Sequence, residues 1–384
     1  MWRKHFSQLL LPFLERIPKQ FPNSTSRFCR HSSTSCQLEV TQVKSRSLIR
    51  LRGAESLPLL QGLLTNDVAH LETKSSFYTL LLNHQGRVLF DAIVYKSPSD
   101  EDSVLLECDS AFRSKLVSHL KLYRLKRKVE IEAEDKLAVW VAYDAAHLSG
   151  FRITSAGHTH PSVLYNLSDN CCEPLTNYSS KREDFPAKVL DISNVTHFGD
   201  PRLAELGWRI FGPAEINTEQ LFPGISSSQN ISVKDSEEGY KALKYTLGVG
   251  EGVVDIPFGN SFPLEANGDY LHGISFHKGC YLGQELTART HHTGVVRKRL
   301  MPFRLTTAID DKILGDVQSI QILNGKKRPV GKVRGLHGNL GIALFRVEET
   351  LSASTLTLND TLITVSKPSW WPVEASKDIS LGRK

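Results

Sequence analysis

One cysteine of this chain lies in a setting that could make it reactive. Cys280 follows Lys278 and Gly279 and precedes Gly283, in a stretch that is expected to form the start of a helix. A thiol acts as a nucleophile or a metal ligand in its thiolate form, which Lys278, a protonated His277 and a helix N-terminus would all favour. The two glycines also allow a ligand to approach the backbone closely. The alternative is an unreactive cysteine packed beside a tight turn, which is the commoner state of a single cysteine.

Asp91 is a second residue with possible chemistry. It is the only acid in an apolar run over residues 87–95, which alternates with the run at 77–82 around a turn ending in Gly86 and so predicts a β-hairpin. A carboxylate in such a strand is either exposed at the sheet or desolvated with a raised pKa. Charged groups are seldom buried without a partner or a purpose. The residues therefore support both a solvent-facing aspartate and a functional base.

Other polar clusters do not satisfy the requirements of a known kind of site. Residues 248–252 contain three glycines, but they follow a predicted helix and lack the lysine of a phosphate-binding loop. The adjacent Cys171 and Cys172 cannot easily share one metal with tetrahedral geometry. His291 and His292 are consecutive, so their side chains point in different directions. The chain has no Cys-x-x-Cys pair, which argues against a stable iron-sulfur cluster held by this chain alone.

The first 36 residues differ in composition from the rest. They hold six basic residues and one acidic residue, and thus five of the six net positive charges of the chain. They are also rich in Ser and Thr, and their apolar residues are spaced for one helical face, as in organelle-import presequences. We predict a transit peptide over residues 1–36 and import into the mitochondrial matrix, with the plastid and a disordered basic tail as alternatives. The four cysteines that remain are dispersed, which indicates a reducing compartment.

The remainder, residues 37–384, is nearly neutral, with 41 basic and 40 acidic residues. No apolar run approaches the roughly 18 residues that span a bilayer, so we expect no transmembrane segment. A basic run over residues 121–128 is most simply a solvated face. In a nearly neutral chain it does not predict nucleic-acid binding, although an anionic small molecule or an acidic protein would fit it.

The predicted elements mix helices and strands, which indicates an α+β fold. After about residue 143 the sequence becomes polar, and a long surface loop is expected at about 163–187. From residue 295 onward only strand and turn patterns occur, which predicts a small antiparallel barrel or sandwich. We therefore expect one domain over 37–296 and a second over 297–384. Further strands are expected at 47–52, 103–108, 129–133, 137–143 and 203–211, and helices at 53–64, 112–123 and 240–247.

Three stretches together resemble the folate-binding superfamily of the glycine-cleavage aminomethyltransferase: residues 61–67, 86–91, and 262–267 with 278–285. The order Lys-Gly-Cys-Tyr-x-Gly-Gln-Glu over 278–285 resembles the branch that assists iron-sulfur cluster assembly, and residues 285–299 are most similar to its mitochondrial member. This resemblance implies a three-lobed arrangement around tetrahydrofolate with a C-terminal β-barrel. It also implies late maturation of 4Fe-4S proteins, with iron-sulfur cluster carrier proteins and 4Fe-4S client apoproteins as partners.

The resemblance also assigns roles to residues. Asp91 falls where the aminomethyltransferase has an aspartate that acts in methylene transfer, although Phe90 replaces its acidic neighbour. Near the folate tail, where the enzyme has arginine and glutamate, residues 247–251 keep only Glu251. Cys280 and Lys278 become the thiolate site, and a transient cluster could be shared between Cys280 and cysteines of a partner. The expected folate-binding residues are Asn66, Asp67, Asp91, Glu251, Glu265, Tyr281, Gln284, Glu285 and Arg289.

Three classes of function follow. The first is an assembly factor that uses Cys280 as a thiolate during cluster transfer. The second is a folate-dependent one-carbon transferase that uses Asp91 as a base or charge stabiliser. The third is a non-catalytic interaction scaffold, in which neither residue is required.

Overall fold

A computed structural model describes residues 37–97, 100, 102–149, 195–215, 231–307 and 317–372, which all belong to the compact unit Cys36–Lys384. The predicted transit peptide, the polar loop at 163–187, Cys171 and Cys172 lie outside these residues. Within the described ranges, no helix has the length and apolar character needed to cross a membrane.

The first sheet is antiparallel and carries Asp91. It has the order β3-β4-β5-β2-β6. The predicted hairpin is confirmed: the Asn83 side chain accepts from the backbone N–H groups of Gln85 and Arg87, and Gly86 has φ +77°, which glycine adopts without strain. The strands are β2 (Arg46–Arg52), β3 (Ser76–Leu82), β4 (Val88–Lys96), β5 (Ser103–Asp109) and β6 (Glu130–Glu134).

Three helices cover one face of this sheet. Leu59 of α1 and Leu116 and Leu120 of α3 are buried in a cluster with Phe77 and Val94 of the strands. The residues three and four apart in α3 share one face, which explains why this amphipathic helix packs on the sheet. The helices are α1 (Ser56–Gln61), α2 (His70–Thr73) and α3 (Arg113–Arg124), with the short 3-10 turn η1 (Ser110–Phe112) before α3.

The second sheet has the order β10-β1-β7-β9-β8, and only its β1–β10 pair is parallel. The predicted strand at 203–211 begins later, at Trp208, because Ala204–Leu206 forms the 3-10 turn η4 and Gly207 then turns the chain at φ +75°. Its strands are β1 (Leu38–Gln42), β7 (Leu137–Asp144), β8 (Thr196–Gly199), β9 (Trp208–Pro213) and β10 (Ile231–Lys234), and the 3-10 turn η2 (Ala145–Ser149) follows β7.

The C-terminal strands form a closed barrel of order β11-β14-β13-β12-β15-β16, which decides between the barrel and the sandwich. Closure pairs every strand on both sides and leaves no exposed edge. The elements are β11 (Lys298–Leu305), η6 (Val317–Ser319), β12 (Gln321–Asn324), β13 (Pro329–His337), β14 (Leu340–Arg346), α8 (Val347–Leu351), β15 (Leu356–Leu358) and β16 (Thr361–Val365).

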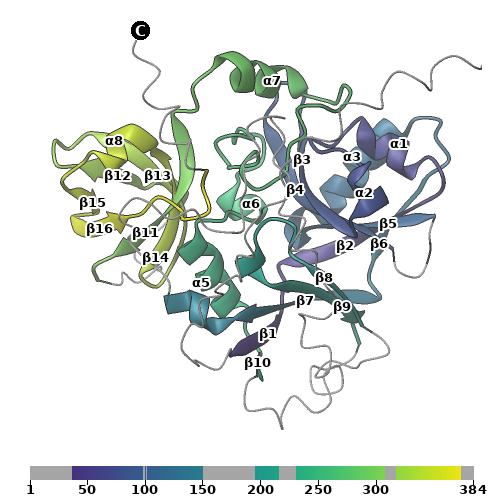
Figure 1. Cartoon of the computed structure of the whole chain (residues 1–384), viewed down its shortest axis with the longest axis horizontal. Coiled ribbons are helices and arrows are strands. Elements are labelled where there is room, and N and C mark those ends of the chain that lie inside the picture. The colour runs from purple at the N-terminus through teal and green to yellow at the C-terminus, as the bar shows by residue number, and fades with distance from the viewer. Residues whose placement is uncertain are drawn as a thin grey trace, which may run out of the picture. The chain divides into compact units, whose positions relative to one another are not determined.

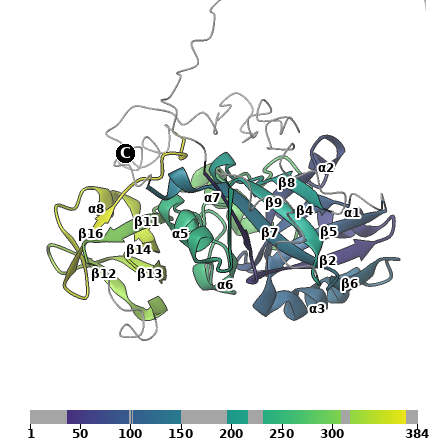
Figure 2. The same ribbon diagram turned by 90° about the horizontal axis from the view of Figure 1, so that it is seen from below.

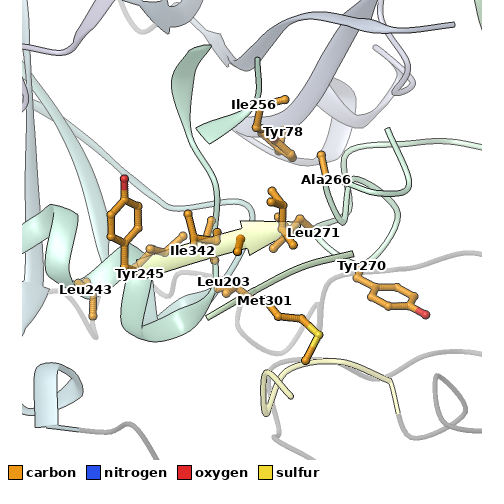
Figure 3. Packing of buried hydrophobic residues seen from close by; sticks show 14 of the residues in the cluster. Tyr78, Leu203, Leu243, Tyr245, Ile256, Ala266, Tyr270, Leu271, Met301 and Ile342 are labelled. Atoms are coloured by element: carbon orange, nitrogen blue, oxygen red, sulfur yellow. The ribbon is translucent and has the colours of Figure 1, made fainter. Parts of the chain in front are cut away.

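The two sheets and the barrel share one hydrophobic core. Helix α5 (Glu238–Leu247) contacts β11, β13 and β14 of the barrel and ends at Gly248 in the left-handed conformation, as predicted. Figure 2 shows α5 between the barrel and β7. The cluster extends from Tyr78 of β3 through Tyr245 to Met301 of the barrel (Figure 3). The short helix α6 (Gly252–Asp255) contacts β4, β5 and β13 and lies between the first sheet and the barrel (Figure 1). The α+β fold with a terminal barrel is therefore confirmed.

Candidate functional site

Cys280 is exposed, and it lies in a segment that precedes α7 (Gln284–Thr293). The prediction that the helix begins at the cysteine is wrong: the first helical residue is Gln284, and Gly283 before it has φ +78°. Only glycine adopts this left-handed conformation without strain, so Gly283 sets the position at which the helix can begin. Helix α7 includes His291 and His292 and ends at Thr293, before Gly294. In Figure 1, α7 runs above the region between the barrel and the first sheet.

Lys278 fixes this segment to the first sheet's helical layer. Its Nζ atom donates to the carbonyl oxygens of Gln61 over 2.8 Å, Leu64 over 2.7 Å and Asn66 over 2.8 Å. The end of a helix leaves carbonyl groups without partners, and α1 ends at Gln61, so the ammonium supplies donors to this turn. Burial lowers the pKa of Lys278 to about 8, against the opposing attraction of Asp67.

These contacts change the role expected of Lys278. An ammonium has three N–H donors, and all three are directed to backbone carbonyls. The sequence predicts that Lys278 and a helix N-terminus lie beside the Cys280 thiol and favour its thiolate form. In the structure neither group lies in that position. Lys278 instead positions the chain from which Cys280 projects.

Three further contacts hold the same segment. The backbone N–H of Leu282 donates to the carbonyl of Gly62 over 3.0 Å, and that of Tyr281 donates to Oε1 of Gln284 over 3.1 Å. The ring of Tyr281 lies 5.0 Å from Nζ of Lys278, and burial raises the pKa of Tyr281 to about 12. A Cβ atom on Gly283 would overlap the carbonyl oxygen of Asn83 in the β3–β4 turn. The sequence suggests that a ligand approaches the backbone at Gly283. In the structure the β3–β4 hairpin occupies that position.

The two ends of the thiol-bearing stretch are stacked on each other. The rings of Phe276 and His291 lie 3.5 Å apart between centroids with an interplanar angle of 8°. This contact closes the chain between residues 276 and 291 into a loop that includes Cys280. No heavy atom outside its neighbours lies within 4 Å of a Cβ placed on Gly279, so the backbone beside the thiol is open. The arrangement presents the thiol to another molecule on a fixed support.

Cys108 provides an internal comparison. It is the other cysteine within the described residues, and it is 1% exposed in β5. Burial raises the pKa of Cys108 to about 12, although Arg46 opposes this effect. Cys108 therefore stays protonated and has no route to a partner protein, whereas Cys280 is accessible. Since no group of three or more His, Cys, Asp or Glu side chains in the described ranges could hold a metal, a cluster at Cys280 would need ligands from elsewhere.

Asp91 is buried, so the solvent-facing interpretation is wrong. Its side chain is 3% exposed, and its Oδ2 atom accepts from Nη1 of Arg46 over 3.0 Å. The backbone N–H of Gly252 donates to its Oδ1 atom over 3.1 Å. Arg46 also pairs with Glu107 over 3.0 Å. Asp91 thus has a cationic partner, and that partner lies in β2 of the same sheet, separated from β4 by β5.

Glu251 belongs to the same buried ionic network. Nη2 of Arg209 lies 2.6 Å and Nη1 of Arg202 2.7 Å from its Oε2 atom, and Arg209 also pairs with Glu107 over 2.8 Å. Burial alone would raise the pKa of Glu251, but Lys244 and the arginines hold it well below its ordinary value. The arginines that pair with Glu251 therefore come from the stretch around β9.

Sequence reasoning missed most of this network. Its further members are Arg46, Glu107, Asp200, Arg202, Arg209, Tyr240 and Lys244. Asp91 is noticeable in the sequence because it is a charged residue in an apolar strand. The same pattern would identify Glu107 and Arg209. Their pairing could not be read from the sequence, since they lie on different sheets.

The expected folate-binding residues occupy four places in the structure. Asn66, Asp67, Tyr281 and Gln284 lie around Lys278, and Glu285 and Arg289 are exposed on α7. Asp91 and Glu251 are in the buried network. Glu265 lies at the barrel, where its carbonyl accepts from Leu300 and burial raises the pKa of its carboxyl against Lys298 and Arg334.

Several of the polar groups of these residues are engaged by partners within the protein. The Asn66 amide donates to the carbonyls of Tyr78 and His272, each over 2.8 Å, and the carboxylates of Asp91 and Glu251 are paired with arginines. The side chains of the network around Asp91 and Glu251 are at most 8% exposed, so the two carboxylates lie in the protein interior. The buried Tyr78 hydroxyl lacks a hydrogen-bond partner within the described residues.

Comparison with known proteins extends the resemblance over most of the chain. Residues 15–141 match the GCVT N-terminal domain, and residues 297–373 match the CAF17 C-terminal beta-barrel domain. The chain is 33% identical over 352 residues to "Iron-sulfur cluster assembly factor IBA57, mitochondrial" of Mus musculus, covering 87% of this chain and 86% of the relative. The protein of the same name from Homo sapiens is 34% identical over 348 residues, with 86% and 85% covered.

A solved structure shows the same fold. The glycine cleavage system aminomethyltransferase T from Bartonella henselae superposes with a TM-score of 0.60 and 13% sequence identity. The match covers 88% of this chain and 87% of that protein. At this level of identity the likeness concerns the fold, and the site has to be argued from its own residues.

Proposed function

The chain belongs to the IBA57 family of mitochondrial iron-sulfur cluster assembly factors, and we propose that it assists the maturation of 4Fe-4S proteins through the exposed thiol of Cys280. The observation that carries this proposal is that the exposed thiol projects from a segment held in place by hydrogen bonds. Cys280 is open to a partner, while Lys278 and Leu282 are hydrogen-bonded to the turn after α1. A ligand on a fixed support costs less conformational entropy when it binds than a ligand on a loose loop.

The chemistry we propose for Cys280 is thiolate donation. On binding iron of a cluster, the thiol releases its proton and its sulfur becomes one ligand of the metal. Iron-sulfur clusters are held by several cysteine thiolates, so the other ligands would come from a carrier protein or a client apoprotein. The cluster is therefore cargo shared between two proteins. Partners with iron-sulfur chemistry follow from the family, and their assignment as carriers and 4Fe-4S client apoproteins is part of this proposal.

The experiment is complementation of cells depleted of the endogenous protein. Cys280→Ser should fail to restore aconitase activity and protein lipoylation, because serine is a poor ligand for cluster iron. Cys108→Ala is the matched control, since Cys108 is buried away from any partner, and it should restore both. The abundance and melting temperature of each variant are measured in parallel. Normal aconitase and lipoylation with Cys280→Ser would contradict the proposal and favour an interaction scaffold.

Binding of tetrahydrofolate is a second candidate function. The match to the GCVT N-terminal domain supports it, as does the unpartnered Tyr78 hydroxyl beside the ionic network. The contacts of Asp91 and Glu251 oppose it, because both carboxylates are already neutralised by buried arginines. We therefore derive no step through tetrahydrofolate, and aminomethyl transfer by Asp91 stays a prediction that these contacts do not support.

The protein is mitochondrial, as its relatives are. We propose the matrix as its compartment and residues 1–36 as its transit peptide, on the basis of their charge and amphipathic spacing. Import of the full chain into isolated mitochondria should shorten it by about that segment. A chain that is imported at full length would contradict the assignment of a cleaved presequence.

A further inference from the structure

The positive charge of the folded region is concentrated at α3. Residues 113–129 contain seven basic residues and no acidic residue, whereas residues 37–384 as a whole contain 41 basic and 40 acidic residues. The remainder of this region therefore carries a net negative charge. A surface that concentrates one sign of charge attracts partners of the opposite sign and increases their rate of association.

A groove of about 330 Å³ lies along the same helix. Leu89 and Phe90 of β4 and Phe258 after α6 provide its apolar side, and Lys115 and His119 of α3 line the other side. Phe258 is 37% exposed, and its ring meets that of Phe90 edge to face with 5.5 Å between centroids. The groove thus exposes aromatic surface, which is common where a protein receives a side chain from a partner.

Lys115 and His119 at the groove have aromatic neighbours, but among the described residues Lys115 has no carboxylate partner and Nε2 of His119 has no hydrogen-bond partner. No carboxylate pairs with Lys115 in the part of the chain that the structure describes, and its Nζ atom lies 4.2 Å from the ring centroid of Phe112 and 5.3 Å from that of Phe258. The Nε2 atom of His119 is buried and has no hydrogen-bond partner among the described residues. Buried polar atoms without a partner are few in native proteins, and each calls for an explanation such as a ligand.

The groove continues along α3 as an exposed apolar stripe. Lys115, His119 and Leu122 are four and three residues apart and so share one face of the helix. The side chain of Leu122 is 69% exposed, and Leu125 beyond the helix is 78% exposed. Leu125 has φ +52°, a conformation that a branched side chain seldom adopts. The apolar stripe is therefore flanked by cations and open to solvent.

We propose that this groove and the adjoining face of α3 bind an acidic segment of a partner protein, with one apolar side chain of that segment inserted between Phe90 and Lys115. The carboxylates of the segment pair with Lys115 and with the basic residues at 126–128. Charge complementarity identifies the partner as acidic. The apolar lining of the groove consists of Leu89, Phe90 and Phe258, which offers room for one apolar side chain of the segment. A membrane surface offers anionic charge but no side chain to fill a concave groove.

The test uses a defined peptide and the full chain. The probe is fluorescein-labelled Glu-Asp-Glu-Phe-Glu-Asp-Glu, and its binding is followed by fluorescence anisotropy at low and at physiological salt. Lys115→Glu and Leu122→Asp should each weaken binding by about tenfold or more, because one reverses a charge and the other removes apolar contact. Both side chains are exposed, so folding is retained. Lys332→Glu, at an exposed lysine of the barrel, is the matched control and should leave binding unchanged within about twofold.

A second peptide, in which serine replaces the phenylalanine, tests the groove itself and should bind about tenfold more weakly. Equal binding of the two peptides would overturn the proposal, because attraction would then be purely electrostatic. Equal losses with Lys332→Glu and Lys115→Glu would overturn it for the same reason. Vesicles of phosphatidylcholine and cardiolipin form the last arm. If they bind the full chain in a Leu122-dependent manner and the peptides do not bind, the surface is a membrane site and the proposal is wrong.

Discussion

The ammonium of Lys278 donates a hydrogen bond to the carbonyl oxygen of Leu64 over 2.7 Å and so joins residues that lie 214 positions apart in the chain. With the carbonyls of Gln61 and Asn66, this contact attaches the thiol-bearing segment to the turn after α1. Cys280 lies two residues beyond the lysine, so its position depends on this attachment. Lys278 is thus a positioning residue, because its ammonium group is hydrogen-bonded to backbone carbonyl oxygens.

Replacement of Lys278 by methionine should lower the free energy of unfolding by about 1–3 kcal/mol at pH 7, because buried carbonyls lose their donors. The loss is measured by urea denaturation. Lys332→Met, at an exposed lysine, should change stability by less than about 0.5 kcal/mol. A methionine variant as stable as the wild type would show that water replaces the ammonium without cost.

The same pair of proteins should differ in pH dependence. Burial lowers the pKa of Lys278 from its ordinary value of 10.5 to about 8, so between these values the unfolded chain retains a proton that the folded chain has released. Stability rises with pH wherever the unfolded state binds more protons. The wild type should therefore gain stability relative to Lys278→Met between pH 8 and pH 10. The opposite slope would mean that the three hydrogen bonds keep the lysine charged.

The two described cysteines should react at different rates with iodoacetamide. In the native protein Cys280 should be alkylated at least about tenfold faster than Cys108, because the first is exposed and the second is buried and protonated. Mass spectrometry of tryptic peptides measures the two rates. In urea the rates should become similar, which is the control for sequence effects. Equal rates before unfolding would show that β5 opens readily.

Two glycines that flank Cys280 should respond differently to alanine. Gly283→Ala places a Cβ against Asn83 at φ +78° and should cost about 1–3 kcal/mol and impair complementation. Gly279→Ala meets nothing within 4 Å and should be tolerated in stability and in cells. Thermal unfolding and aconitase recovery measure the two effects. Loss of aconitase with a stable Gly279→Ala would instead indicate a partner that touches this backbone.

Asp91 should prove to be a structural residue. Asp91→Ala leaves Arg46 with less neutralising charge in a buried site, and we expect a loss of about 3–5 kcal/mol in unfolding free energy. Glu132→Ala, at an exposed acid of β6, is the control and should change stability by less than about 0.5 kcal/mol. A stable Asp91→Ala protein that fails in complementation would restore the interpretation of Asp91 as a functional base.

Reduced folates should show no saturable binding to the folded protein. The expectation rests on the paired state of Asp91 and Glu251 and on the use of the Asn66 amide by backbone carbonyls. Isothermal titration calorimetry with 5-formyltetrahydrofolate at about 100 μM would detect dissociation constants up to the high micromolar range. A saturable heat that Glu251→Gln abolishes would show that the ionic network opens to admit the ligand.

The elements of this protein follow from local patterns in the sequence. The β3–β4 hairpin is readable because apolar runs flank Asn83 and Gly86, and the end of α5 is readable from Gly248. The same local reasoning selects Asp91 and Cys280 as unusual residues, since one acid interrupts an apolar run and one thiol lies among glycines and cations. It places the start of α7 too early, because the left-handed turn at Gly283 depends on its packing against Asn83.

The sequence by itself determined the α+β class, the terminal β domain and the residues that deserve study. Only the tertiary structure decided their roles. Asp91 acquires its partner Arg46 from β2, 45 positions away, and Lys278 acquires its carbonyl partners from α1 and the turn that follows, more than 200 positions away. The physical reason is that hydrogen bonds within a turn or strand depend on neighbours in sequence, whereas the burial and pairing of a charge depend on whatever the fold brings around it.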